Sequence, residues 1–240
     1  MLFFGWLRCF RTVRRAGRYE IKIYAAAGRF RVFCMEKRDG RERGMEYKPL
    51  PIGTDDFKKL IENGCYYVDK TLWIKDLLDR KSEASLFTRP RRFGKTLNLS
   101  MLRYFFEDTG NAERNEENRR LFDGLAIADA GGKYAEYMQK YPVISLTLKS
   151  AKQGSFEYAF ERMRESIAKE FARHEKTVIP ALDNKADAEK YMKIREEKAP
   201  ESDYYTSLSF LSDCLYKAYD KKSIILLDEY DVPLENAYYR

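Results

Sequence analysis

A basic run that ends in Gly94, Lys95 and Thr96 constrains the fold of this chain more than any other segment. The run lies between a short apolar stretch, Ala84 to Phe87, and a helix-like stretch, Leu97 to Phe106. A Gly-Lys-Thr at a strand-to-helix turn is typical of a phosphate-binding loop. Backbone N–H groups at such a turn, together with the positive end of the helix dipole, favour the phosphates of a nucleotide. We therefore expect Lys95 to reach the β- and γ-phosphates and the Thr96 hydroxyl to hold Mg2+.

The loop departs from the general pattern at its first position. The pattern Gly-x-x-x-x-Gly-Lys-Ser/Thr places a glycine five residues before Gly94, where this chain has Arg89. Taken alone, the segment is equally consistent with a basic surface turn that precedes a helix.

A second segment, far downstream, favours the nucleotide-binding interpretation. Ile224 to Leu227 are consecutive apolar residues, which predicts a parallel strand buried on both faces. Asp228 and Glu229 follow this strand directly. Ligands of open parallel sheets bind beyond the carboxyl ends of the strands, so the acidic pair and the loop are expected at the same edge. Together the two motifs predict a nucleotide site.

The positive charge of the chain is concentrated in its first part. Residues 1–44 contain twelve Lys or Arg and four Asp or Glu, whereas the formal charge of the whole chain is +7. The remainder is therefore close to neutral, and the overall basicity does not indicate a nucleic-acid partner for it. Strand-like alternation runs from Tyr19 to Tyr24 and from Arg29 to Phe33. A nucleic-acid-binding arm has this character. We favour another explanation, in which these residues result from a start codon that was placed too far upstream of Met45, or form a poorly ordered tail.

Several function classes lose support from the composition. No apolar stretch approaches the roughly 18 residues that span a membrane, and no secretory signal is present, so we expect a cytoplasmic protein with no membrane partner. The single histidine, His174, lies between Arg173 and Glu175 and is expected on the surface. Zinc and redox sites are disfavoured because the cysteines show no metal-binding spacing; they are Cys9, Cys34, Cys65 and Cys214.

Hydrophobic periodicity predicts the other elements. A strand is expected from Val143 to Leu148, and the charged residues 108–120 predict an exposed connection. An apolar stripe indicates an amphipathic helix, for which core packing is favoured over a ligand pocket. The stripe consists of Phe156, Phe160, Met163, Ile167 and Phe171. Further helices are expected over Asp55 to Asn63, Leu72 to Leu78, Ala186 to Glu197 and Asp203 to Tyr219.

Six segments match, in order, the motifs of one protein family. They are Leu50 to Gly53 with Phe57, Tyr67 to Thr71, Arg89 to Thr96, Phe122 to Ile127, Tyr141 to Ile144 and Leu227 to Leu234. From about Leu50 onward, the chain resembles the predicted AAA-ATPase-like family of bacteria and archaea, whose members often carry a C-terminal PD-(D/E)XK nuclease-like domain. The phosphate loop of this family also lacks the first glycine, so Arg89 fits its pattern.

The resemblance implies an α/β fold of the P-loop NTPase type, in which an additional strand lies between the phosphate-loop strand and the Asp-Glu strand. It implies ATP and Mg2+ as ligands, with Mg2+ held by Thr96 and Asp228. Glu229 matches the carboxylate that polarises the attacking water, and Lys95 is the second residue expected to be catalytic. The implied nucleotide-binding residues are Arg91, Arg92, Phe93, Gly94, Lys95 and Thr96.

The sequence does not assign a single role to several residues that match the family pattern. Asp231 either pairs with a Lys or Arg of the loop or takes part in catalysis. Arg91 and Arg92 either contact phosphate or acidic partners or are solvated side chains. Asp69 and Lys70 match the family pattern, but their chemistry is unassigned.

The resemblance also implies a C-terminally incomplete domain, because further strands follow the Asp-Glu strand in the family and this chain ends at Arg240. We expect residues 1–44 to be a basic extension and residues 45–240 to be the AAA-ATPase-like domain. The expected function is ATP binding with Mg2+-dependent hydrolysis at the γ-phosphate, impaired by the missing strands. The alternative is a non-hydrolysing nucleotide-sensing or nucleic-acid-associated module that regulates a nuclease-like domain or partner. The oligomeric state does not follow from the sequence.

Overall fold

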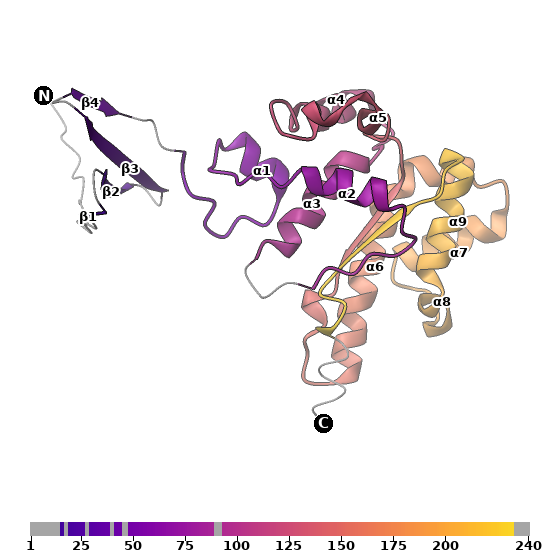
Figure 1. Cartoon of the computed structure of the whole chain (residues 1–240). Coiled ribbons are helices and arrows are strands. Elements are labelled where there is room, and N and C mark those ends of the chain that lie inside the picture. Colours follow the sequence, from indigo (N-terminus) through magenta and orange to yellow (C-terminus); the bar gives the residue numbers. More distant parts are fainter. Residues whose placement is uncertain are drawn as a thin grey trace, which may run out of the picture. The chain divides into compact units, whose positions relative to one another are not determined.

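The structure is a computed structural model that describes residues 48–88 and 93–232, together with the backbone of four strands that precede them. It divides the chain into two compact units, Met1–Asp69 and Lys70–Arg240 (Figure 1). The boundary expected at residue 45 stays a prediction.

The first unit contains an antiparallel sheet whose four strands are neighbours in sequence order. They are β1 (Arg15–Ala16), β2 (Tyr19–Ala26), β3 (Arg29–Arg38) and β4 (Arg41–Gly44). In the register of β2 and β3, Tyr19 lies opposite Glu36 and Ala26 opposite Arg29. The strand-like alternation in this region is thus confirmed, and each strand extends beyond the range expected for it.

The first unit also contains the helix α1 (Phe57–Glu62). The side chain of Asp56 caps it by accepting a hydrogen bond of 2.9 Å from the Lys59 N–H, which satisfies one of the unpaired donors of the first turn. Phe57 and Leu60 are buried. The rings of Phe57 and Tyr67 pack edge to face, with their centroids 5.5 Å apart. The helix predicted over residues 55–63 is confirmed.

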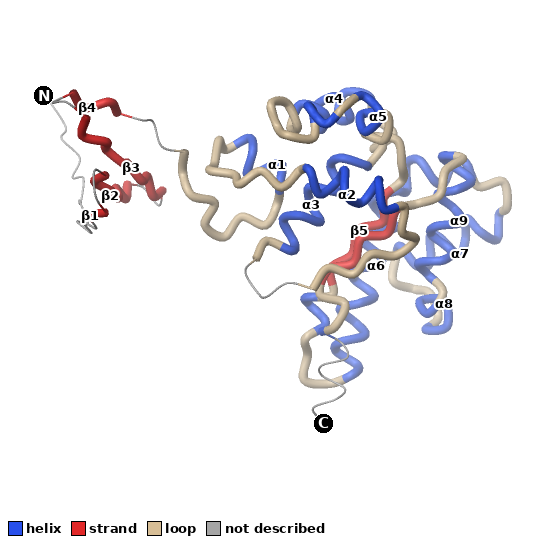
Figure 2. The backbone as a smooth tube through the Cα atoms, in the orientation of Figure 1, coloured by secondary structure: helices blue, strands red, loops and turns tan. Residues whose placement is uncertain are grey.

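A parallel pair of strands lies within the second unit and holds its candidate site (Figure 2). The strands are β5 (Val143–Thr147) and β6 (Ile224–Asp228), and the register sets Val143 beside Ile224 and Thr147 beside Asp228. Because side chains alternate between the faces of a strand, Ile144 and Leu146 share one face and Leu226 and Asp228 the other. The β5 strand confirms the prediction for residues 143–148.

The face with Ile144 and Leu146 packs on a hydrophobic core of the unit. This core is built by α6 (Phe156–Val178), α7 (Lys185–Arg195), α8 (Glu201–Tyr205) and α9 (Ser207–Tyr219). Phe171 and Tyr191 are fully buried, and the Tyr191 hydroxyl donates a hydrogen bond of 2.6 Å to the Phe171 carbonyl. The stripe predicted for α6 is confirmed in its second half, whereas Phe156 is 68% exposed.

The remaining helices of the second unit are α2 (Leu72–Arg80), α3 (Lys95–Phe106), α4 (Ala112–Arg120) and α5 (Gly132–Ala135). Helix α3 contacts both β5 and β6. The Thr71 hydroxyl, which is fully buried, accepts a hydrogen bond of 3.1 Å from the Ile127 N–H. Phe105 of α3 packs edge-on against Phe122 at 5.3 Å between centroids. The first of these contacts joins two of the segments that resemble family motifs, and the second joins one of them to α3.

Two predictions about strands are wrong. Residues 84–87 form a loop, not a strand, because no described segment pairs with their backbone groups. The strand β6 is not buried on both faces, since Ile225 is 46% and Leu227 40% exposed. Among the described residues β5 is its only neighbour, and the additional strand implied by the resemblance has no counterpart there.

Two predictions about helices are corrected as well. The connection expected over residues 108–120 is helical in its second part, where Asn111 caps α4 by accepting a hydrogen bond of 2.9 Å from the Arg114 N–H. The single helix expected over residues 203–219 is divided into α8 and α9. The division follows from Ser207, whose buried hydroxyl donates to the Tyr204 carbonyl at 2.8 Å.

Candidate functional site

The N-terminal end of α3 begins at a glycine in a left-handed conformation. Gly94 precedes the helix with φ +74°, in the left-handed region that glycine adopts without a steric penalty. The Asn98 N–H donates to the Gly94 carbonyl at 2.9 Å, so the helical hydrogen bonds begin there. Lys95 is the first residue of the helix and is half-buried, and Phe93 is 55% exposed. The unpaired N–H groups of this first turn suit an anion.

Thr96 links this turn to the end of β6. Its hydroxyl donates a hydrogen bond of 2.7 Å to Oδ2 of Asp228, which lies 132 residues further along the chain. Asp228 is 8% exposed and is the last residue of β6. Its carbonyl accepts a hydrogen bond of 2.9 Å from the Leu148 N–H, which continues the pairing of β5 with β6 by one residue. The structure therefore brings one residue from each motif together at the carboxyl edge of the sheet.

Glu229 follows Asp228 with an unusual backbone. Its φ is +53°, a left-handed conformation that a residue other than glycine rarely adopts and that costs about 1 kcal/mol or more. The Glu229 carbonyl accepts a hydrogen bond of 3.2 Å from the Val232 N–H, and its side chain is half-buried. Such outliers concentrate at functional sites, where the surrounding structure maintains them.

Thr96 and Asp228 carry oxygen atoms of the kind that could hold a magnesium ion. Mg2+ takes hard oxygen ligands and usually retains several water molecules, so one hydroxyl and one carboxylate from the protein are sufficient when phosphate supplies the rest. Within the described residues, no group of three or more His, Cys, Asp or Glu side chains is arranged so that it could hold a metal ion by itself. A cation held here would thus depend on water and phosphate for its other ligands.

The other predicted site residues are placed as follows. Arg89, Arg91 and Arg92 lie outside the described residues. Asp231 is exposed and forms no hydrogen bond or ion pair with another described residue, so its two possible roles remain predictions. Asp69 and Lys70 directly precede the buried Thr71, at the boundary between the two units.

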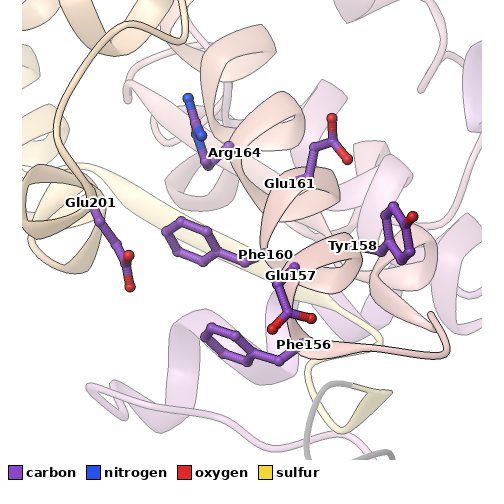
Figure 3. A pocket seen from close by; sticks show the side chains of 7 residues that line it. All are labelled: Phe156, Glu157, Tyr158, Phe160, Glu161, Arg164 and Glu201. Carbon is purple, nitrogen blue, oxygen red and sulfur yellow. The ribbon is translucent and has the colours of Figure 1, made fainter.

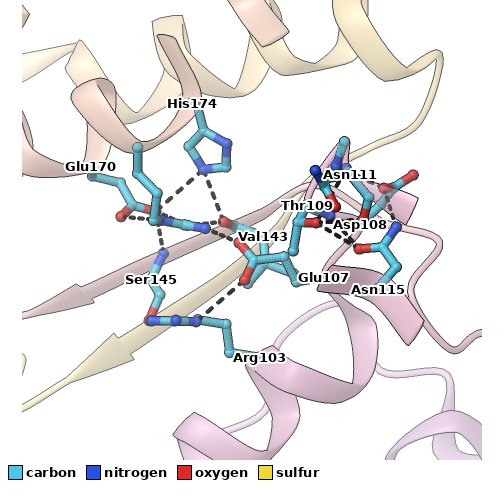
Figure 4. Close-up of polar contacts among 12 residues, drawn as sticks. Arg103, Glu107, Asp108, Thr109, Asn111, Asn115, Val143, Ser145, Glu170 and His174 are labelled. Carbon is cyan, nitrogen blue, oxygen red and sulfur yellow. Dashed lines mark hydrogen bonds and ion pairs between the residues drawn. The ribbon is translucent and has the colours of Figure 1, made fainter. Parts of the chain in front are cut away.

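A buried polar network lies at the opposite end of α3 and was not predicted from the sequence (Figure 4). Arg173 of α6 forms ion pairs with Glu107, which follows α3, and with Glu170. Glu107 and Glu170 are 3% and 5% exposed. Burial lowers the pKa of Arg173 to about 9, yet the guanidinium stays charged at neutral pH and lies between the two carboxylates.

The network also holds β5 and corrects the prediction for the only histidine. His174 is 5% exposed rather than solvated, and its Nε2 lies 3.1 Å from the Val143 carbonyl. The Ser145 N–H donates to Glu170 at 2.7 Å. The polar neighbours of His174 suggested exposure, but Glu170 and Arg173 turn inward because β5 offers them backbone partners. Their three-residue spacing on one helix was the available signal.

A model of the AAA-ATPase-like family, described as "Predicted AAA-ATPase", matches residues 51–240. An "Uncharacterized protein in vnfD 5'region" of Azotobacter chroococcum mcd 1 is 36% identical over 104 residues, which cover 43% of this chain and 17% of that protein. The match therefore spans about a sixth of the length of that relative. No solved structure matches the chain. In the described part of the chain, no helix is long and apolar enough to cross a membrane.

Proposed function

Because the chain belongs to the AAA-ATPase-like family, we propose that it binds ATP together with Mg2+ at the N-terminal end of α3 and hydrolyses the γ-phosphate bond. The observation that carries the proposal is the hydrogen bond of 2.7 Å between Thr96 and Asp228. It joins the hydroxyl and the carboxylate that a P-loop NTPase uses around its metal, although they come from segments far apart in the sequence.

The first turn of α3 would bind the phosphates. Gly94, in its left-handed conformation, leaves the backbone open to close approach, since nothing lies within 4 Å of the position that a Cβ atom would take. The N–H groups of the turn donate to phosphate oxygens, and the Lys95 ammonium adds a positive charge at the start of the helix. Phe93, Arg91 and Arg92 are proposed to border the nucleotide on the loop side.

Thr96 and Asp228 would hold Mg2+, whose charge lowers the repulsion between phosphate oxygens and the attacking water. Glu229 is proposed to accept the proton of that water. Its position directly after the metal-binding carboxylate, at the carboxyl end of β6, is suitable for this role. Phosphoryl transfer needs positioning and charge neutralisation more than covalent participation, and these residues provide both.

The proposal is tested with the full chain and three variants. Binding of a fluorescent ATP analogue is measured by anisotropy, and phosphate release by a coupled assay, each with Mg2+ and with EDTA. We expect Lys95→Ala to weaken binding at least about tenfold, because a charged contact to phosphate is lost. Glu229→Gln is expected to keep binding and to lower turnover at least about a hundredfold.

Lys169→Ala serves as the matched control, because Lys169 is an exposed lysine of α6 away from the turn. It is expected to behave like the unaltered chain in both assays. Binding that is unaffected by Lys95→Ala would contradict the proposed site. Mg2+-dependent binding without turnover in the unaltered chain would instead identify a nucleotide sensor that does not hydrolyse ATP.

A further inference from the structure

A second candidate site lies on the first turns of α6, separate from the pair Thr96 and Asp228. These turns and α8 enclose a hollow of about 370 Å3 (Figure 3). We call it the aromatic-acidic groove and define it by residues that line it, namely Phe156, Phe160, Glu157, Glu161, Arg164 and Glu201. Nothing in the proposed ATP chemistry uses any of them.

The aromatic part of the groove has one fixed ring and one exposed ring. Phe156 and Phe160 stack with centroids 5.9 Å apart and an interplanar angle of 14°. Phe160 also packs edge-on against Tyr204, whose side chain is 5% exposed, so it is attached to the core. Phe156 is 68% exposed and leaves a ring in solvent beside the fixed one. The groove thus has an exposed aromatic face beside its hollow.

The polar part of the groove is acidic. Of the four charged residues that define it, three are glutamates, and the fourth, Arg164, is engaged by other partners. The Arg164 guanidinium stacks over the ring of Tyr204 at 5.0 Å and donates a hydrogen bond of 2.5 Å to the Glu197 carbonyl. Glu161 is exposed and forms no ion pair or hydrogen bond with another described residue. Glu201 accepts a hydrogen bond from the Tyr205 hydroxyl, which holds its carboxylate in place. The groove thus presents negative charge next to aromatic rings.

We propose that the aromatic-acidic groove binds an arginine-bearing segment of a protein partner. A guanidinium combines a flat surface, which stacks on aromatic faces, with a fork of donors that matches a carboxylate. The exposed Phe156 ring offers the stacking surface, and Glu161 and Glu201 offer carboxylates on α6 and α8. An ammonium group lacks the flat surface and the fork, so lysine is the weaker ligand.

The test uses a fluorescein-labelled peptide in which arginine alternates with glycine, and anisotropy is measured without nucleotide. The first control peptide carries citrulline, which is neutral and similar in shape, at each arginine, and the second carries lysine. We expect the citrulline peptide to bind at least about tenfold more weakly than the arginine peptide. The affinity of the lysine peptide is expected to lie between those two. Equal binding of the arginine and citrulline peptides would overturn the proposal, and so would lysine binding as tight as arginine binding.

Two variants of the full chain locate the binding. Phe156→Ala and Glu161→Gln change exposed side chains, so the fold is expected to persist. Each is expected to weaken the arginine peptide about three- to tenfold, whereas Glu189→Gln on the exposed surface of α7 leaves it unchanged. If Glu189→Gln weakens binding as much as Glu161→Gln does, the attraction is general and the groove is not the site. Because no nucleotide is present, the result is independent of the proposed ATP site.

Discussion

At the scale of single residues, the contact that matters most is the one between Thr96 and Asp228. Asp228 is almost completely buried, and its carboxylate requires a partner when no metal is bound. The Thr96 hydroxyl is such a partner at 2.7 Å. The same two groups are hard oxygen ligands, so the hydrogen bond maintains in the absence of Mg2+ the arrangement that we propose for its presence.

Replacing Thr96 therefore gives a sharp prediction. Thr96→Val retains the shape but removes the hydroxyl, which leaves the Asp228 carboxylate without its donor. We expect the free energy of unfolding to fall by about 1–3 kcal/mol, and the gain in ATP affinity on adding Mg2+ to be lost. Urea denaturation measures the first effect, and binding titrations with Mg2+ or EDTA measure the second.

Thr96→Ser is the matched control, since it keeps the hydroxyl and removes a methyl group. It should retain the Mg2+ dependence of binding. If Thr96→Val retained it too, the hydroxyl would not be a metal ligand.

At the scale of elements, α3 is held at both ends by residues remote in sequence. Its first turn is bonded to β6 through Thr96, and Glu107 after its last turn is paired with Arg173 of α6. Arg173 and His174 also reach the Val143 carbonyl of β5. The helix α3 is thus fixed relative to both strands, which positions its first turn, our proposed phosphate site, beside Asp228.

The buried network should contribute strongly to stability only as a complete unit. Arg173→Met removes the positive charge, so Glu170 stays buried without an arginine and Glu107 keeps only its ion pair of 3.3 Å with Arg103. We expect a loss of about 3–5 kcal/mol. Adding Glu107→Gln removes one of the two carboxylates, and the double variant should recover part of that loss. The free energies come from urea denaturation of the single and double variants.

Arg162→Ala provides the comparison, because Arg162 pairs with Glu165 at 2.9 Å on the surface of the same helix. The expected loss is below about 1 kcal/mol. Equal losses for Arg173→Met and Arg162→Ala would show that burial does not strengthen the network.

At the scale of the whole molecule, the second unit combines a parallel strand pair with helices that pack on both of its faces. One face rests on the core of α6, α7 and α9, and the other carries Asp228 toward α3. Ligand binding at the carboxyl edge would therefore engage elements from both faces. A ligand that binds only the folded chain stabilises it in proportion to the logarithm of its concentration.

We expect ATP with Mg2+, at about a hundred times its dissociation constant, to raise the free energy of unfolding by about 2.7 kcal/mol. In the Asp228→Asn variant, the stabilisation by ATP with Mg2+ should fall to the level that ATP gives in the presence of EDTA. Urea denaturation followed by circular dichroism measures both. If ATP stabilised the unaltered chain equally with Mg2+ and with EDTA, the proposed role of Asp228 as a metal ligand would be contradicted.

Much of the local structure was predictable because it depends on neighbours in the sequence. The periodicity of α6 and the apolar run of β6 are both patterns within a few residues. The wrong predictions concern residues whose burial or pairing depends on segments far away in the sequence. His174 looked exposed from its neighbours but is buried against β5, and residues 84–87 have the composition of a strand but no described neighbour to pair with.

The sequence by itself determined the chemistry available to this protein, since Gly94, Lys95, Thr96, Asp228 and Glu229 are the residue types that a phosphate and a cation require. Only the tertiary structure decided which of them meet. Thr96 and Asp228 are 132 residues apart, and their contact exists because α3 packs across two strands that pair in parallel. The inward turn of Arg173 has the same origin, because its partners Glu107 and Val143 come from other elements of the chain.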